Sequence, residues 1–172
     1  LISAVADADA LIIRSDKVTE QVLAAAPKLK IVVRAGAGYD NVDLAAATAH
    51  NVVVMNTPVQ NSNAVAELAI AMMIYMCRGQ FTPATGTEIL GKKVGIQAFG
   101  NVGRLVGKKA EALGMSVMAI DPFIPAEKIQ EAGAVPAASV EELYGNCDFI
   151  SVHIPATPQT IGSIGYDLIS KM

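Results

Sequence analysis

The sequence is poor in aromatic residues, cysteine and histidine. Only 5% of its 172 residues are aromatic, none is Trp, and it has two cysteines and two histidines. Two cysteines are too few for a disulfide framework. Neither Cys77 nor Cys147 belongs to a Cys-x-x-Cys pair or has a neighbouring His, so we expect no metal site. Sparse cysteine is typical of a reducing compartment, and we expect the cytoplasm.

The chain also lacks an excess of positive charge and a long apolar run. It has 13 basic and 16 acidic residues, a net charge of -3, so we expect no nucleic acid partner. The mean hydropathy is high at +0.42, but the longest nearly apolar stretch, residues 64–77, contains Glu67. This stretch is shorter than the roughly 18 residues that a membrane span needs, so we expect no membrane partner.

Aliphatic residues are abundant, since 52% of the chain is hydrophobic despite the few aromatics. This composition is typical of α/β proteins, in which buried parallel strands are covered by Ala-rich helices. Strand and helix patterns alternate along the whole chain. The predicted strands are residues 10–14, 31–35, 52–55, 93–98, 116–120 and 149–153, and the predicted helices are 19–26, 42–50, 64–78, 101–113, 125–131, 139–144 and 166–172.

Residues 79–86 have neither a helical nor a strand period and contain Gly, Thr and Pro, so we predict a linker there between domains 1–78 and 87–172. Asn41 and Asn63 are predicted helix caps, with Thr19 or Thr57 acting likewise in their turns. The chain starts at Leu1, and its last predicted helix has no cap or following strand, so we expect a fragment of a longer protein.

The sharpest motif is residues 95–104, GIQAFGNVGR, between a predicted strand and a predicted helix. It departs from the dinucleotide fingerprint G-x-G-x-x-G only at Ala98, where a positive φ would cost an alanine about 1 kcal/mol. Gly100 occupies the place where a pyrophosphate approaches the backbone, and Gly103 the place where helix packs on strand. The anion would bind the free amides of Asn101 and Val102 at the start of the helix.

Asp121 lies 21 residues after Gly100, at the end of the next predicted strand. A carboxylate there accepts hydrogen bonds from the adenosine ribose and repels a 2'-phosphate, which favours NAD over NADP.

Residues 86–93, GTEILGKK, are similar to a nucleotide triphosphate loop. They lack its final hydroxyl and precede a strand, so we reject that interpretation.

Two further polar turns follow predicted strands. In residues 34–41 the amides of Ala37 and Gly38 would form a small anion site, or the turn is a tight connection capped by Asn41. Residues 56–63 are either a ligand-facing loop or an Asx-type turn.

The two histidines differ in their predicted positions. His153 ends a strand at the carboxyl edge of the sheet, where it would either face a cofactor or serve as a buried structural histidine. His50 is predicted to be a solvated residue at the end of a helix.

These segments together resemble the D-isomer-specific 2-hydroxyacid dehydrogenases, in particular the short branch that acts on 3-phospho-D-glycerate. The resemblance covers nearly the whole chain. Its segments are residues 10–15 (ALIIRS), 34–44 (RAGAGYDNVDL), 56–58 (NTP), 65–68 (VAEL), 86–88 (GTE), 100–104 (GNVGR), 121–122 (DP) and 147–153 (CDFISVH).

The resemblance implies a Rossmann-like NAD-binding domain in residues 87–172 and a flavodoxin-like substrate domain in residues 1–78, both incomplete, which close around the linker. The implied reaction is oxidation of 3-phospho-D-glycerate to 3-phosphohydroxypyruvate with NAD, in serine biosynthesis. The implied substrate residues are Arg14 and Ser15 for the phosphate, Ala37 and Gly38 for the carboxylate, and Asn61. The implied cofactor residues are Thr57, Gly100, Asn101, Val102, Gly103, Asp121, His153, Ile154 and Pro155.

The resemblance also implies a homodimer formed through the NAD domain. The family's catalytic arginine, glutamate and histidine would follow Met172, so we expect the 172-residue chain alone to be inactive. Ala98 replaces a glycine, and Val59 stands where many relatives carry Gly or Asn. Two alternatives remain open. One is a dehydrogenase for another acid such as lactate, glycerate or formate, and the other is a non-catalytic NAD-sensing module of the same fold.

Overall fold

The computed structural model describes all 172 residues and contains two compact units, Leu1–Asn61 and Ser62–Met172. The predicted boundary at residues 79–86 differs from this division because of one helix, α3 (Ser62–Cys77). Its buried residues Ala66, Ile70 and Met73 join the core of the second unit. Burial of this apolar face assigns α3 to the second unit by packing, although the sequence places it before the linker.

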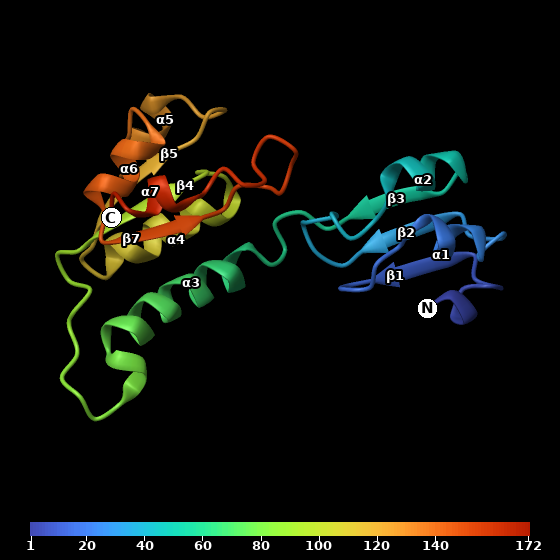
Figure 1. Cartoon of the computed structure of the whole chain (residues 1–172), viewed down its shortest axis with the longest axis horizontal. Helices are drawn as coiled ribbons and strands as arrows, with labels where there is room; N and C mark the ends of the chain where they lie inside the picture. Colours follow the sequence, from blue (N-terminus) through green and yellow to red (C-terminus); the bar gives the residue numbers. More distant parts are fainter. The chain divides into compact units, whose positions relative to one another are not determined.

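The first unit is a three-stranded parallel sheet covered by two short helices (Figure 1). Its strand order is β1-β2-β3, and its core includes Ile13, Val32, Leu23 and Ala47. The elements are the 3-10 turn η1 (Ile2–Ala4), β1 (Ala10–Ile13), α1 (Glu20–Ala24), β2 (Ile31–Arg34), α2 (Leu44–Ala49) and β3 (Val53–Asn56). These elements confirm the first two predicted strand–helix repeats and the strand of the third, with ends shifted by a few residues.

The predicted caps of α2 and α3 were wrong. Asp43 is the N-cap of α2, and its carboxylate accepts from the Ala46 amide at 2.9 Å. Asn41 instead donates its Nδ2 to the Asp16 carbonyl at 2.7 Å, joining the turn after β2 to the segment after β1. Asn63 lies inside α3, where it bonds Glu67. Sequence patterns do not distinguish neighbouring Asn and Asp residues that can all act as caps.

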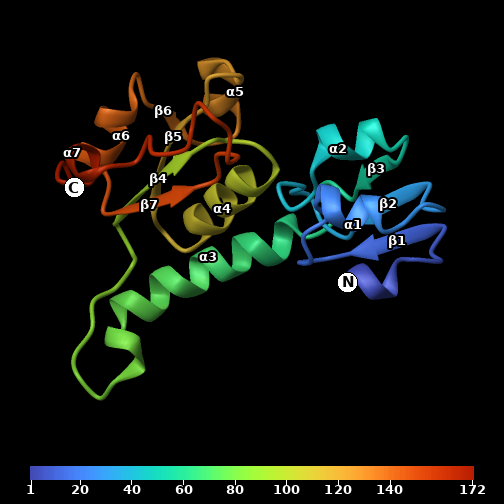
Figure 2. The same ribbon diagram turned by 45° about the vertical axis from the view of Figure 1, so that its right-hand side comes forward.

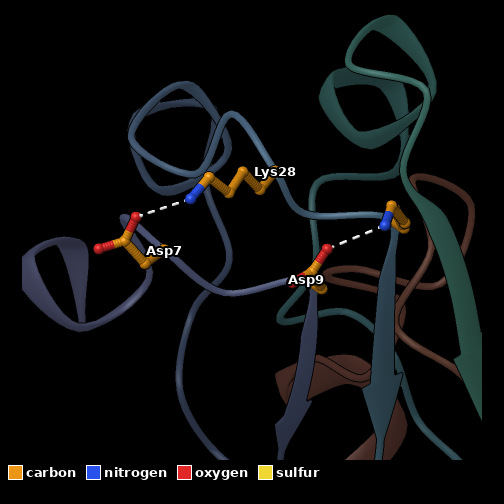
Figure 3. A network of polar contacts seen from close by, with 4 residues as sticks. Asp7, Asp9 and Lys28 are labelled. Atoms are coloured by element: carbon orange, nitrogen blue, oxygen red, sulfur yellow. Dashed lines mark hydrogen bonds and ion pairs between the residues drawn. The ribbon is translucent and has the colours of Figure 1, made fainter.

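Two exposed ion pairs lie at the amino end of this sheet (Figure 3). Lys28 Nζ is 3.1 Å from Asp7 Oδ1, and Lys30 Nζ is 2.9 Å from Asp9 Oδ1. Pairs this exposed contribute little to the stability of a fold, because water screens both charges. They do neutralise the lysines at this end of the sheet.

The second unit is a four-stranded parallel sheet with strand order β6-β5-β4-β7. Besides α3, its elements are η2 (Gly79–Phe81), β4 (Lys93–Gln97), α4 (Asn101–Ala112), β5 (Ser116–Ile120), α5 (Ala126–Glu131), β6 (Val135–Pro136), α6 (Val140–Asn146), β7 (Phe149–Val152) and α7 (Tyr166–Ile169). Strand β6 was not predicted, because two residues that include a proline carry no recognisable strand pattern.

Helices cover both faces of this sheet (Figure 2). Ile96 faces α4, whose Gly107 it approaches, while the adjacent Gly95 faces Leu143 of α6. Successive residues of a strand point to opposite faces, so α4 and α6 lie on opposite sides. The strand order reverses between β4 and β7, and their carboxyl ends form the crevice in which such folds bind ligands.

No helix in the structure is both long and apolar enough to cross a bilayer. No three His, Cys, Asp or Glu residues are grouped so that they would hold a metal ion.

Candidate functional site: a dinucleotide cradle and an anion-binding turn

The loop after β4 turns sharply into α4. Ala98 adopts φ +76°, the left-handed conformation that suits the glycine usually found there. Gly103 packs directly against this loop, since a Cβ there would overlap the Ala98 carbonyl oxygen and lie 3.0 Å from Ile96 Cγ2. The absence of a side chain at Gly103 therefore allows the first turn of α4 to contact the strand it follows.

Gly100 has the opposite surroundings. It is exposed, it is the N-cap of α4, and a Cβ built on it would meet no atom within 4 Å. The amides of Asn101 and Val102 are the first N–H groups of this 12-residue helix and have no partner within it. The space above Gly100 is therefore open to an anion that would accept from these amides at the positive end of the helix.

The Asp121 carboxylate is held in place by two backbone amides. Its Oδ2 accepts from Phe99 N at 2.8 Å, and its Oδ1 accepts from Phe123 N at 2.8 Å. Each oxygen retains a lone pair for a ribose hydroxyl. Neither amide partner is evident from the sequence, because Phe99 comes close to Asp121 only through the pairing of β4 with β5.

His153 immediately follows β7 at the carboxyl edge of the sheet. It is half-buried, its Nε2 lies 2.8 Å from Ser151 Oγ, and burial lowers the pKa of the imidazole below its usual value. His153 therefore favours its neutral form. Together with Phe149, it lines an apolar groove of about 430 Å³ between β7 and α3. Ile154 and Pro155 continue from it, half-buried and exposed respectively.

A second hollow in this unit has a buried polar floor. Gln97 ends β4, and its Oε1 accepts from the Tyr144 hydroxyl at 3.0 Å in the interior. Gln97 also lines a cavity of about 500 Å³, together with Glu141, Ser163, Tyr166, Asp167 and Lys171 among others. Sequence reasoning did not identify this cavity, because its walls come from β4, α6 and α7.

The first unit brings its own candidate residues to the carboxyl end of its sheet. The turn after β2 is tied to β3 by two hydrogen bonds: Asn56 Nδ2 donates to the Ala37 carbonyl at 2.7 Å, and Thr57 N donates to the Gly36 carbonyl at 3.0 Å. These bonds use the carbonyls of the turn and leave the Ala37 and Gly38 amides without a backbone partner. Arg14 and Ser15 follow β1 directly and are exposed, as is Asn61 at the end of the unit.

One residue of this turn was missed by sequence reasoning. Arg34 is the last residue of β2, and its Nε is buried without a hydrogen-bond partner. The available signal was a charged residue at the end of an otherwise apolar strand, directly before a glycine turn.

The predicted residues thus divide between the units. Arg14, Ser15, Ala37, Gly38, Thr57 and Asn61 lie in the first, and Gly100, Asn101, Val102, Gly103, Asp121, His153, Ile154 and Pro155 lie in the second. The second set fits a dinucleotide, because it combines an open glycine, free helix amides and a fixed carboxylate at one sheet edge.

Comparisons with known proteins agree with this interpretation. The family profile described as "D-isomer specific 2-hydroxyacid dehydrogenase, catalytic domain" matches residues 1–161. The D-3-phosphoglycerate dehydrogenase of Mycobacterium tuberculosis (strain ATCC 25618 / H37Rv) is 42% identical over 186 residues, covering 99% of this chain and 35% of that protein. The enzyme of the same name from Rattus norvegicus is 43% identical over 177 residues, covering 94% of this chain and 33% of that protein.

Solved structures show the same fold. The NAD+-bound 3-phosphoglycerate dehydrogenase of Entamoeba histolytica has a TM-score of 0.90 and 46% identity, with 99% of this chain and 54% of that chain covered. The D-lactate dehydrogenase of Aquifex aeolicus, complexed with NAD and lactic acid, has a TM-score of 0.84 and 26% identity, with 100% and 56% covered. The chain thus spans about a third of the curated relatives and about half of these solved chains, and it belongs to the D-isomer specific 2-hydroxyacid dehydrogenase family.

Proposed function

We propose that the protein carrying this chain oxidises 3-phospho-D-glycerate to 3-phosphohydroxypyruvate with NAD, the first committed step of phosphorylated serine biosynthesis. The observation that carries this proposal is that the sequence identity is higher to 3-phosphoglycerate dehydrogenases than to D-lactate dehydrogenases. Identity to 3-phosphoglycerate dehydrogenases is 37–46%, against 26% to D-lactate dehydrogenases. The fixed Asp121 carboxylate favours NAD over NADP, because it would repel a 2'-phosphate.

In this proposal residues 87–172 bind NAD, and residues 1–78 contribute the substrate domain. The Asn101 and Val102 amides hold the pyrophosphate over Gly100, Asp121 holds the ribose, and Thr57, Gly103 and the segment His153–Ile154–Pro155 complete the cofactor site. Bound NAD would accept the hydride that leaves C2 of the substrate. Arg14 and Ser15 bind the phosphate, Ala37 and Gly38 the carboxylate, and Asn61 lines the same site.

The residues of this chain bind and orient the reactants. We expect the acid–base residues outside it, and we expect the 172-residue chain to bind ADP-ribose without producing NADH.

Steady-state kinetics test the reaction in a protein of the family's full length. NADH formation is followed with 3-phosphoglycerate, lactate, glycerate and formate. We expect the highest kcat/KM for 3-phosphoglycerate, and turnover confined to an unphosphorylated acid would refute the substrate assignment. NADH production by the 172-residue chain would refute the expectation that it is inactive.

A dehydrogenase for another 2-hydroxy acid is the second candidate, since the lactate and glyoxylate enzymes share the fold at TM-scores of 0.82–0.85. Arg14→Met separates the two. Loss of a cation that binds phosphate raises the KM for a phosphorylated substrate by about 10-fold to 100-fold, whereas the KM for lactate would not change. A protein that binds NAD but turns over none of these acids would instead be an NAD-sensing module.

We also propose a cytoplasmic homodimer that forms through the unit carrying the NAD loop. Support comes from an exposed apolar face on α3 and the turn after it, where Leu68, Met72, Met76 and Phe81 are 58–69% exposed. Patches of this kind mark interaction surfaces. Sedimentation velocity of wild type and Met72→Lys tests the dimer: the variant should sediment as a monomer, and an unchanged dimer would exclude this face. Both cysteines are free, which agrees with a reducing compartment.

A further inference from the structure

Arg104 is an exposed cation on α4 that forms none of the ion pairs of the structure. Its side chain turns back instead to the loop that precedes the helix, where its Nε donates to the carbonyl oxygen of Phe99 at 3.1 Å. The same guanidinium lies 6.0 Å from the centroid of the Phe99 ring. An exposed arginine on a helix ordinarily keeps its guanidinium in water, so these contacts indicate a role within the loop.

The carbonyl that Arg104 binds has no backbone partner. Phe99 is only 1% exposed, and no backbone amide donates to its oxygen. The Phe99 ring is anchored against α4, since a Cβ on Gly107 would lie 3.5 Å from its Cε2. Without Arg104 the carbonyl would either remain unpaired in the interior or turn toward water. Both outcomes cost free energy, so Arg104 stabilises the observed orientation of this residue.

Two peptide groups of the dinucleotide loop depend on that orientation. The amide of Phe99 donates to Asp121 Oδ2 at 2.8 Å. The carbonyl of Phe99 belongs to the next peptide group, whose N–H is that of Gly100. Every peptide bond is trans, so this N–H points away from the carbonyl and from Arg104. It has no backbone partner and lies at the open N-cap of α4. The bond from Arg104 therefore orients the loop on both its ribose side and its anion side.

This loop requires support because its first residue is strained. Ala98 adopts φ +76°, a conformation that suits glycine better than alanine. Strained backbone persists only where the surrounding structure holds it in place. Gly103 supports the loop from below, where a Cβ would overlap the Ala98 carbonyl oxygen, and Arg104 supports it from the exposed side.

We propose that Arg104 is a positioning residue of the dinucleotide site. By holding the Phe99 carbonyl, it keeps the Phe99 amide on Asp121 and so keeps the Asp121 carboxylate directed at the ribose. The inference rests on the proposed function, in which the ligand is NAD, and adds a residue that does not touch the ligand. Because Asp121 would accept from the 2'-hydroxyl, Arg104 sets how strongly the site prefers a ribose over a 2'-deoxyribose.

Titration calorimetry with ADP and 2'-deoxy-ADP tests the proposal in a protein of the family's full length. The two ligands share the base and both phosphates and differ only in the 2'-hydroxyl. The wild type should prefer ADP by about 10-fold or more, the factor expected for one charge-assisted hydrogen bond. Arg104→Met should reduce this preference to less than about threefold. Lys108→Met removes the next cation along the same groove and should keep the wild-type preference.

The same comparison separates positioning from direct contact with phosphate. If Arg104 bound the diphosphate, Arg104→Met would weaken both ligands equally and leave the preference intact, which would overturn the proposal. Arg104→Lys keeps the charge but has no Nε, so it should lose the preference as the Met variant does, and a wild-type preference would count against the Nε bond. In Asp121→Ala the preference should be absent, and adding Arg104→Met should not change the ratio further. A further change would show that Arg104 acts by another route.

Hydrogen exchange at the Phe99 amide gives a readout that needs no ligand. Arg104→Met should accelerate exchange of this amide by about 10-fold or more, while Ile96 within β4 exchanges as in the wild type. Unchanged exchange at Phe99 would overturn the proposal, as would equal acceleration at both amides, which indicates a general loss of stability. A wild type that binds neither nucleotide would instead refute NAD binding, and the exchange rates would then decide the role of Arg104.

Discussion

Three glycines, the N-cap of α4 and two within the helix, allow the packing and ligand roles of the dinucleotide loop to be measured separately. A Cβ at Gly103 would overlap the Ala98 carbonyl oxygen. One at Gly107 would lie 3.3 Å from Ile96 Cδ1 and 3.4 Å from Val117 Cγ1. One at Gly100 would meet nothing within 4 Å. Replacing each by alanine adds the same methyl group to three different surroundings.

The expected free energies follow from these contacts. Alanine is favoured over glycine inside a helix by about 1 kcal/mol. Overpacking costs about 1–3 kcal/mol, and the upper end applies at Gly103, because a backbone carbonyl cannot rotate away. Gly103→Ala should therefore destabilise the second unit by about 1–2 kcal/mol. At Gly107 the neighbouring side chains can shift, so the cost of overpacking and the gain in helix propensity nearly cancel. Gly100→Ala should cost only about 0.5 kcal/mol, because alanine is a weaker N-cap than glycine.

Amide hydrogen exchange in β4 measures this stability, because it reports opening of the second unit alone. Titration calorimetry with ADP-ribose measures binding to the same proteins. Gly100→Ala should lower ADP-ribose affinity by at least about 10-fold, since its methyl group occupies the place of the pyrophosphate. Gly107→Ala is the matched control and should bind as wild type. Wild-type exchange in Gly103→Ala would refute the packing argument, and wild-type affinity in Gly100→Ala would refute the ligand site.

Three further changes test single features of the second unit. Ala98→Gly should stabilise the protein by about 0.5–1 kcal/mol in urea denaturation, because φ +76° strains alanine but not glycine; a loss of stability would contradict this. Tyr144→Phe should cost about 1–3 kcal/mol, since it leaves Gln97 Oε1 buried without its donor, and a neutral effect would mean that water replaces the hydroxyl. Burial lowers the pKa of His153, so the unfolded chain binds a proton first as the pH falls below about 6.5. The stability of the wild type should therefore fall as the pH drops below about 6.5, and His153→Gln should lose that part of the pH dependence.

Local patterns predicted the elements well where they were long and bounded by strong signals. Strand β5 was predicted at its observed bounds, and Gly114 ends α4 with φ +80° as a helix-terminating glycine. The cap of α2 was misassigned because Asn41 and Asp43 are both capable caps. The choice between them depends on the Asp16 carbonyl, which lies 25 positions before Asn41 in the chain.

Among the candidate site residues, those within continuous motifs could be found from the sequence. Gly100, Gly103 and Asp121 have a fixed spacing, because a βαβ unit places them at one sheet edge. The roles of Phe99 and Phe123 could not be found, since a backbone amide has no sequence signature. The assignment of α3 to the second unit was also missed, because it depends on which core receives Ala66, Ile70 and Met73.

The sequence by itself determined the parallel α/β class, the dinucleotide loop and the family, because each depends on residue types at short, regular spacings. Only the tertiary structure decided the strand orders, the division after Asn61 and the two amides that hold Asp121. It also showed Arg34 folded over Gly36 with a buried, unpaired Nε. The physical reason is that a single chain position carries a charge and a propensity, whereas burial, close approach and an unpaired hydrogen bond arise only when distant segments come together.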